Sequence, residues 1–219
     1  MPRTITVRGT GKISAKPDEI SVSLTVETKD PDYAAAMEKA DREAEAISDA
    51  VREAGIEEDA LRMADFNVRA DYEGVHDEHG NWTNVFRGYA VVRTYALRFP
   101  LDTDRLSALL GGVGASEANP QLSVSFVLSD PEKAKRDALE AAVRDAREKA
   151  ELLARASGCE LSTLLSAEYS VAHRDPVSET AFACDTAAMP MMAKGAFRMN
   201  AAPKDVEVTD SAVFTWEIR

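Results

Sequence analysis

The densest group of side chains that could do chemistry lies in the sequence DYEGVHDEHG, between residues 71 and 80. Its candidate metal ligands are Asp71, Glu73, His76 and His79. Imidazole nitrogens and carboxylate oxygens together bind divalent metals, so a metal site is one hypothesis for this stretch. The zincin pattern does not fit, because it places His-Glu-x-x-His on a helix, whereas these histidines belong to a predicted loop over residues 73–84. The alternative is a solvated hairpin tip without a ligand.

A second group, Gly9, Gly11 and Lys12, suggests a phosphate-binding loop, but its spacing is wrong for one. A P-loop needs GxxxxGK followed by Ser or Thr, and it leads from a strand into a helix. Apolar and polar residues instead alternate from Thr4 to Ala15, which predicts a strand. Glycines inside a strand often mark a close approach of another backbone. We therefore predict that they make room for a tightly packed Ala-rich helix, with approach of a ligand as the alternative.

The segment AAMPMMAKGAFRM, from Ala187 to Met199, is unusually apolar for a connection between strands. Connections run over the surface, where a patch of large apolar side chains needs a cover. Methionine adapts to irregular partner surfaces. We predict that the segment is an interface between copies of the chain, formed by Met189, Met191, Met192, Phe197 and Met199. Packing against the chain's own sheet and a soft-metal site are the alternatives. We identify no motif for a catalytic residue or a cofactor.

Two long charged, Ala-rich segments predict the helices, and each follows an Asp-Pro pair. Asp30-Pro31 and Asp130-Pro131 both suit an N-cap followed by proline at the first helical position. SVSLTVETKDP and SVSFVLSDP precede the two helices, which favours an internal duplication of strand–helix–strand units. The duplication predicts that both helices lie side by side on one face of a shared sheet.

Composition limits the partners and the compartment. The 219 residues carry a formal net charge of −12, which argues against a nucleic acid or an anionic membrane surface as partner. No apolar run approaches the roughly 18 residues of a membrane span, and Met1 leads directly into a strand without a secretory leader. Cys159 and Cys184 lack a CxxC spacing, so we expect free thiols. The predicted location is the cytoplasm, or the periplasm or extracellular space if a signal was removed.

The order of several sequence pieces resembles the SIMPL-domain family, which is widespread in bacteria. These pieces are GTGKISAKPDEISVSLTVE, RGYAVV, ELLARASGCELS and VEVTDSAVFTWEI. The resemblance implies an α+β fold in which two long Ala-rich helices pack on antiparallel sheet. It covers one domain over residues 1–219, with an irregular Met/Ala/Pro-rich segment at 173–204 before the final strand. It also implies self-association and links to stress response and the cell envelope, but no defined reaction.

Two hypotheses for function follow. The first is a non-enzymatic, self-associating interaction or scaffold protein whose partner is itself or another protein. The alternative is a metal-binding protein or an enzyme centred on residues 71–79.

Overall fold

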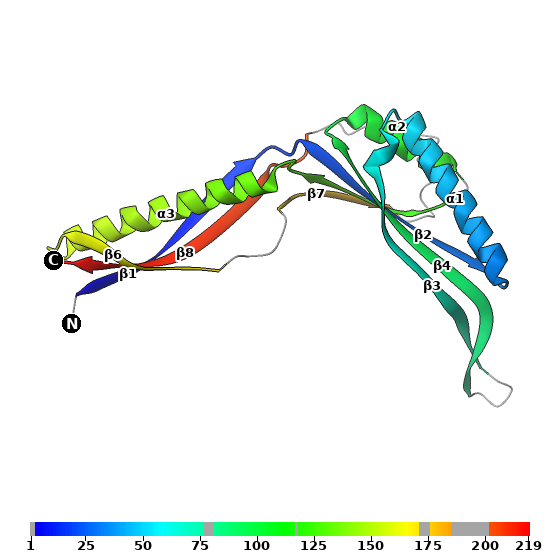
Figure 1. The fold of residues 1–219 in the computed structure, drawn as a ribbon, viewed down its shortest axis with the longest axis horizontal. Coiled ribbons are helices and arrows are strands. Elements are labelled where there is room, and N and C mark those ends of the chain that lie inside the picture. Colours follow the sequence, from blue (N-terminus) through cyan, green and yellow to red (C-terminus); the bar gives the residue numbers. More distant parts are fainter. Residues whose placement is uncertain (1–2, 77–80, 117, 171–175, 185–201) are drawn as a thin grey trace. The chain divides into compact units, whose positions relative to one another are not determined.

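The computed structural model describes residues 3–76, 81–116, 118–170, 176–184 and 202–219. The elements are β1 (Thr4–Ala15), β2 (Glu19–Asp30), α1 (Tyr33–Glu53), the 3-10 turn η1 (Glu58–Ala60), β3 (Leu61–His76), β4 (Trp82–Pro100), α2 (Thr103–Ala115), β5 (Gln121–Val127), α3 (Pro131–Ala156), β6 (Leu161–Tyr169), β7 (Val177–Cys184) and β8 (Val206–Ile218) (Figure 1). The chain divides into two compact units. One comprises Met1–Asp18, Val127–Glu179 and Pro203–Arg219, and the other comprises Glu19–Phe126 and Thr180–Ala202.

The unit that begins at Glu19 is built on a sheet of five strands in the order β3-β4-β2-β5-β7. Alternating residues of β2, namely Ile20, Val22, Leu24 and Val26, are buried on one face, as period-two patterning requires. These residues form one hydrophobic core with the buried stripes of α1 and α2. β2 pairs antiparallel with β4, and β4 pairs antiparallel with β3.

The other unit is a three-stranded antiparallel sheet, β1-β8-β6, with α3 packed against it. The buried residues of α3 are six alanines spaced four apart, from Ala134 to Ala154. A β-carbon added at Gly9 would lie 2.7 Å from the Ala146 Cβ, and one at Gly11 would lie 2.6 Å from the Ala142 backbone nitrogen. The prediction that these glycines accommodate a closely packed helix is confirmed.

The predicted helix starts are half right. Asp130 caps α3 by accepting a hydrogen bond from the Lys133 N–H at 2.8 Å, with Pro131 in the first turn. The cap assigned to Asp30 is wrong, because α1 is capped by Asp32, which accepts from the Ala35 N–H at 2.9 Å. Asp30 instead accepts from the Asp32 N–H in the turn before the helix.

The expected shared sheet is also wrong. α1 packs on β2 and β4 of the five-stranded sheet, whereas α3 packs on β1, β8 and β6 of the three-stranded sheet. The strand before α1, β2, belongs to the sheet that α1 covers, but the strand before α3, β5, does not belong to the sheet that α3 covers. The two sequence units therefore do not have equivalent surroundings. The antiparallel sheets and the long helices of the predicted α+β fold are present.

The prediction of one irregular segment over residues 173–204 missed a strand. Residues 177–184 form β7, the last strand of the five-stranded sheet. The expectation of a single domain over residues 1–219 stays a prediction.

Candidate functional site

The sequence candidates for metal binding lie on the β3–β4 hairpin. Asp71, Glu73 and His76 belong to β3, whereas His79 lies outside the described residues. The loop predicted over residues 73–84 is too long, because β3 continues to His76 and β4 begins at Trp82. The predicted interface residues Met189, Met191, Met192, Phe197 and Met199 all lie outside the described residues.

The carboxylates of this group already have cationic partners. The Lys29 Nζ lies 3.1 Å from Asp71, and this hydrogen bond raises the pKa of Lys29 above its ordinary value. The Arg87 Nε donates to Glu73 at 2.6 Å. Each carboxylate is therefore balanced by a charge from another strand of the same sheet, Lys29 of β2 or Arg87 of β4, which weakens its tendency to attract a cation.

The side chains of Glu73 and His76 point in different directions. Glu73 pairs with Val85 across the hairpin, whereas His76 pairs with Trp82. Successive side chains of a strand alternate between its faces, so Glu73 and His76 lie on opposite faces. Among the described residues, no group of three or more His, Cys, Asp and Glu side chains could hold a metal ion. The metal hypothesis would depend on residues 77–80 and stays a prediction.

The outer part of the hairpin is a two-stranded ribbon. β2 pairs with β4 only as far as Tyr89, opposite Asp30. A register shift follows, because Asp71 pairs with Gly88 but Tyr72 pairs with Phe86, which leaves Arg87 of β4 as the extra residue. Gly88 has a φ of +140°, a conformation that side chains rarely adopt. β3 and β4 then continue as each other's partner to the pair of His76 and Trp82. Two-stranded ribbons are marginally stable alone in water, so contacts between side chains must support this part.

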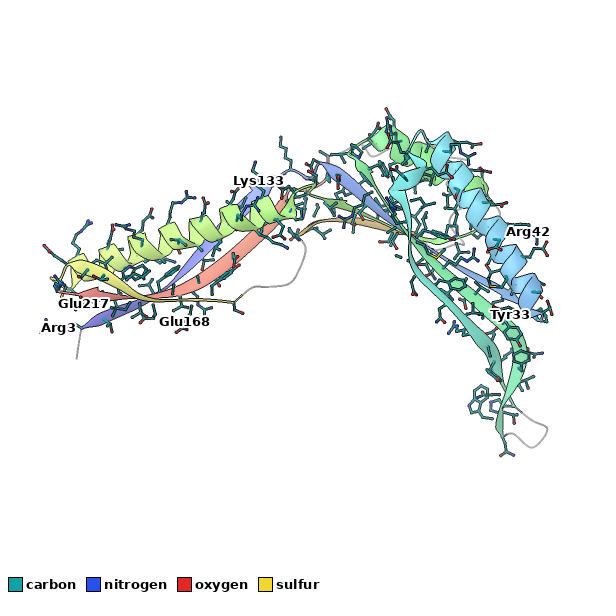
Figure 2. The ribbon with its side chains drawn as sticks, in the orientation of Figure 1. Arg3, Tyr33, Arg42, Lys133, Glu168 and Glu217 are labelled. Carbon is teal, nitrogen blue, oxygen red and sulfur yellow. The ribbon has the colours of Figure 1, made fainter. Side chains whose placement is uncertain are left out.

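Aromatic side chains provide those contacts on one face of the ribbon. Tyr72 and Phe86 are opposite each other, with ring centroids 5.6 Å apart. Phe86 also contacts Tyr89 at 5.4 Å, and Tyr89 contacts Tyr33, the first residue of α1, at 5.4 Å. Figure 2 shows Tyr33 at the end of α1 beside this hairpin. The row is therefore continuous with the sheet face that α1 covers, and it extends beyond the start of the helix.

Trp82 occupies the outer end of this face in a defined position. Its ring stacks on His76, with centroids 4.6 Å apart and an interplanar angle of 15°. A β-carbon at Gly74 would lie 2.7 Å from the Trp82 Cζ3, so the indole covers the glycine backbone. Trp82 nevertheless remains 71% exposed. We name the face formed by residues 72, 74, 76, 82, 84 and 86 the aromatic face.

The aromatic face is a candidate site that the sequence analysis missed. Tyr72, Trp82 and Phe86 are 60%, 71% and 47% exposed, and Tyr33 beside them is 50% exposed. Trp82 and Phe86, which are four residues apart and so share a face in a strand, were the available signal. It was hidden because the polar stretch at 73–84 predicted a loop that includes Trp82.

An ion pair between buried Arg93 and exposed Asp41 anchors α1 on the same sheet face. Arg93 of β4 is 8% exposed and donates to the Ala40 carbonyl at 3.2 Å and to Asp41 at 2.6 Å. Burial lowers the pKa of Arg93, but the hydrogen bond to Asp41 and the nearby Tyr95 hydroxyl outweigh it and keep the pKa above its ordinary value. The Arg93 guanidinium also lies over the Phe66 ring, 5.4 Å from its centroid. This cluster fixes the helix and gives the aromatic face a rigid base.

Comparison with known proteins shows a family match over most of this chain. The family model named SIMPL, described as "Protein of unknown function (DUF541)", matches residues 5–216. The chain is 28% identical over 179 residues to "Uncharacterized protein YggE" of Edwardsiella ictaluri, covering 82% of this chain and 72% of that protein. It is 26% identical to "Uncharacterized protein YggE" of Escherichia coli K12, covering 78% and 68% respectively. In the described residues, no helix has the length and apolar character needed to cross a membrane.

Proposed function

Because the chain belongs to the SIMPL family, whose description gives no function, its role must be argued from its own surfaces, and we propose that it is a non-enzymatic, self-associating interaction protein. The supporting observation is the row of four exposed aromatic side chains on and beside the hairpin, Tyr33, Tyr72, Trp82 and Phe86. When a ring is taken to offer about 200 Å², their exposed fractions amount to about 450 Å², within the range of functional apolar patches.

The charge of the chain makes this patch more significant. A net charge of −12 keeps copies apart, and 29% of the residues are charged. A continuous aromatic row that stays exposed on such an acidic protein lowers solubility unless a partner covers it. We therefore expect association to be driven by apolar contact and opposed by charge repulsion.

Light scattering and sedimentation velocity test the proposal by measuring the mass of the untagged protein at protein concentrations from about 1 to about 100 μM, a range that spans common affinities. We expect a multiple of the 23.8 kDa chain mass at the higher concentrations. Because salt screens repulsion over about 10 Å at 0.1 M and about 3 Å at 1 M, added NaCl should strengthen the association. A monomer at about 100 μM in high salt would overturn the proposal.

The apolar segment around Met189, Met191, Met192, Phe197 and Met199 is a second proposed interface. Replacing Met191, Met192 and Phe197 with serine should lower the measured mass if that segment is covered by a second copy. An unchanged mass would remove the segment from the proposal and leave the hairpin.

The stress-response or envelope setting implied by family resemblance is part of the proposal. It predicts that a strain lacking the protein loses fitness under stress, including stress on the cell envelope. Complementation by the wild type, but not by a variant that cannot associate, would support the role of self-association. Equal complementation by both would contradict it.

A further inference from the structure

We infer that the aromatic face of the β3–β4 hairpin binds the same face of a second copy, across a two-fold axis. This inference rests on the proposed function, since it names the partner and the geometry of the contact. Its starting point is that the outer ribbon has one face rich in aromatic groups and one face that carries charge. The two faces therefore cannot serve equally well as a contact between copies.

The charge pattern selects the aromatic face and a second copy. Its six positions are Tyr, Gly, His, Trp, Asn and Phe, so none carries a carboxylate, an ammonium or a guanidinium group. The opposite face carries the Glu73–Arg87 ion pair. Two chains of charge −12 repel each other over most of their surfaces, and they can meet with least repulsion where neither presents a charge. A two-fold axis brings this uncharged face against itself.

The area agrees with a contact between two copies. The four aromatic side chains expose about 450 Å² per copy, or about 900 Å² for a pair, and a specific interface needs about 1,000 Å². The exposed side chain of Asn84 and the backbone of the ribbon supply the remainder. One hairpin alone would leave the rings half in water, so the contact is complete only when the partner contributes the same residues.

Trp82 is the anchor of this contact. Interface residues that dominate affinity are commonly Trp and Tyr held in defined positions at the centre of the contact. Trp82 is held by His76 on one side and by the Gly74 backbone below, while most of its surface stays exposed. Its side chain therefore loses little conformational entropy on binding.

Cross-linking tests the geometry. Facing sheets lie about 10 Å apart, which is too far for a disulfide between their Cα positions, so a short bis-maleimide is the suitable reagent. In a background with Cys159→Ser and Cys184→Ser, Asn84→Cys places a thiol on the aromatic face between Trp82 and Phe86. Thr83→Cys is the matched control, because it is the neighbouring exposed position on the opposite face. We expect covalent dimers for Asn84→Cys and monomers for Thr83→Cys.

Affinity measurements give an independent readout. Trp82→Ser should weaken dimerisation about thirty-fold or more, the effect of losing one dominant interface residue, whereas Val85→Ser on the opposite face should change it less than about three-fold. Circular dichroism and melting should match the wild type, since the hairpin end lies outside the core. An oligomer with equal cross-linking of both cysteine variants and an unchanged affinity for Trp82→Ser would overturn this inference while leaving self-association intact. A monomeric wild type would overturn both.

Discussion

Asp145 of α3 accepts a hydrogen bond from the backbone N–H of Thr10 in β1, with 2.7 Å between nitrogen and oxygen. Among the described strands β1 pairs with β8 alone, so it is an edge strand, and Thr10 lies between Gly9 and Gly11. The helix therefore sits close enough for one of its carboxylates to reach the edge of the sheet. Such a bond also occupies a donor that could otherwise recruit a foreign strand. The close approach of α3 to β1 at Gly9 and Gly11 therefore also protects the edge of the sheet.

Gly9→Ala and Gly11→Ala should each destabilise the fold by about 1–3 kcal/mol, the usual cost of overpacking. The added methyl groups would meet backbone atoms of Ala138 and Ala142, which cannot rotate away. Urea unfolding at pH 7 measures the effect. Arg8→Ala is the control, because Arg8 lies on the same strand, on its exposed face, and should change stability by less than about 0.5 kcal/mol. If the glycine variants behaved like Arg8→Ala, α3 would not pack as closely as the structure shows.

Asp145 predicts a pH dependence of stability. The hydrogen bond from Lys149, and then that from the Thr10 backbone, lower the pKa of Asp145 below its ordinary value of 3.8. A carboxyl group with a lowered folded-state pKa stabilises the fold fully above its unfolded pKa, and this contribution is lost as the pH falls through the folded value. Asp145→Asn keeps an acceptor oxygen but removes the charge.

The wild type should therefore exceed Asp145→Asn in stability at pH 7, and the difference should shrink below the ordinary pKa of 3.8. Urea unfolding at a series of pH values down to the acid range provides the measurement. Lys149→Met should reduce the pH-dependent part, because it removes the largest cause of the lowered pKa. A difference that grows on acidification would contradict the assignment.

The sequence predicted which face of an element is closely packed better than it predicted which sheet each helix covers. Alternation in β1 identified the face of Gly9 and Gly11, and the alanine stripe of α3 identified its complement, because both depend only on local periodicity. Which sheet each helix covers depends on long-range strand order, which periodicity does not encode. For this reason the sequence did not reveal that β5 belongs to the five-stranded sheet, whereas α3, which follows it in the chain, packs on the three-stranded sheet.

The sequence predicted neither the aromatic face nor the ion pairs of the candidate metal ligands. Asp71, Glu73 and His76 do lie on one hairpin, yet their residue types alone did not reveal that Lys29 and Arg87 pair with the two carboxylates. The outer ends of the two strands, residues 73–76 and 82–84, resemble a loop in sequence because both faces of the ribbon are largely exposed. The alternation of apolar and polar residues that marks a strand requires one buried face.

Arg93 and Asp41 supply a third prediction. Asp41→Ala should destabilise the fold by about 1–3 kcal/mol, although the Asp41 side chain is 63% exposed, because a buried guanidinium loses its anion. Asp49→Ala is the matched control, since Asp49 is 61% exposed on the same helix and pairs with exposed Arg52. It should cost less than about 0.5 kcal/mol.

The double variant Arg93→Met with Asp41→Ala separates the interaction free energy of the pair from the separate contributions of the two side chains. Replacing a buried ion pair by apolar groups is often close to neutral, so the double variant should be more stable than Asp41→Ala alone. Denaturant unfolding of the four proteins in this cycle gives the coupling free energy. Strictly additive effects would show that the two side chains do not interact in solution.

Gly74→Ala should act differently from the substitutions in β1, because the atom that it meets belongs to a side chain. The added methyl would lie 2.7 Å from the Trp82 Cζ3, and the largely exposed indole can move away. We expect a stability change below about 1 kcal/mol together with a displaced Trp82 ring and weaker association.

Tryptophan fluorescence measures this effect. The chain has two tryptophans, and Trp216 is 8% exposed in the other unit, so Trp216→Phe leaves Trp82 as the single reporter. In that background, the emission of Trp82 should shift to shorter wavelength as association buries the ring, and Gly74→Ala should move this transition to higher protein concentration. Gly111→Ala, where a β-carbon meets nothing within 4 Å, is the control and should leave the transition unchanged. A transition that stays in place for Gly74→Ala would show that the position of the indole on Gly74 does not matter to the contact.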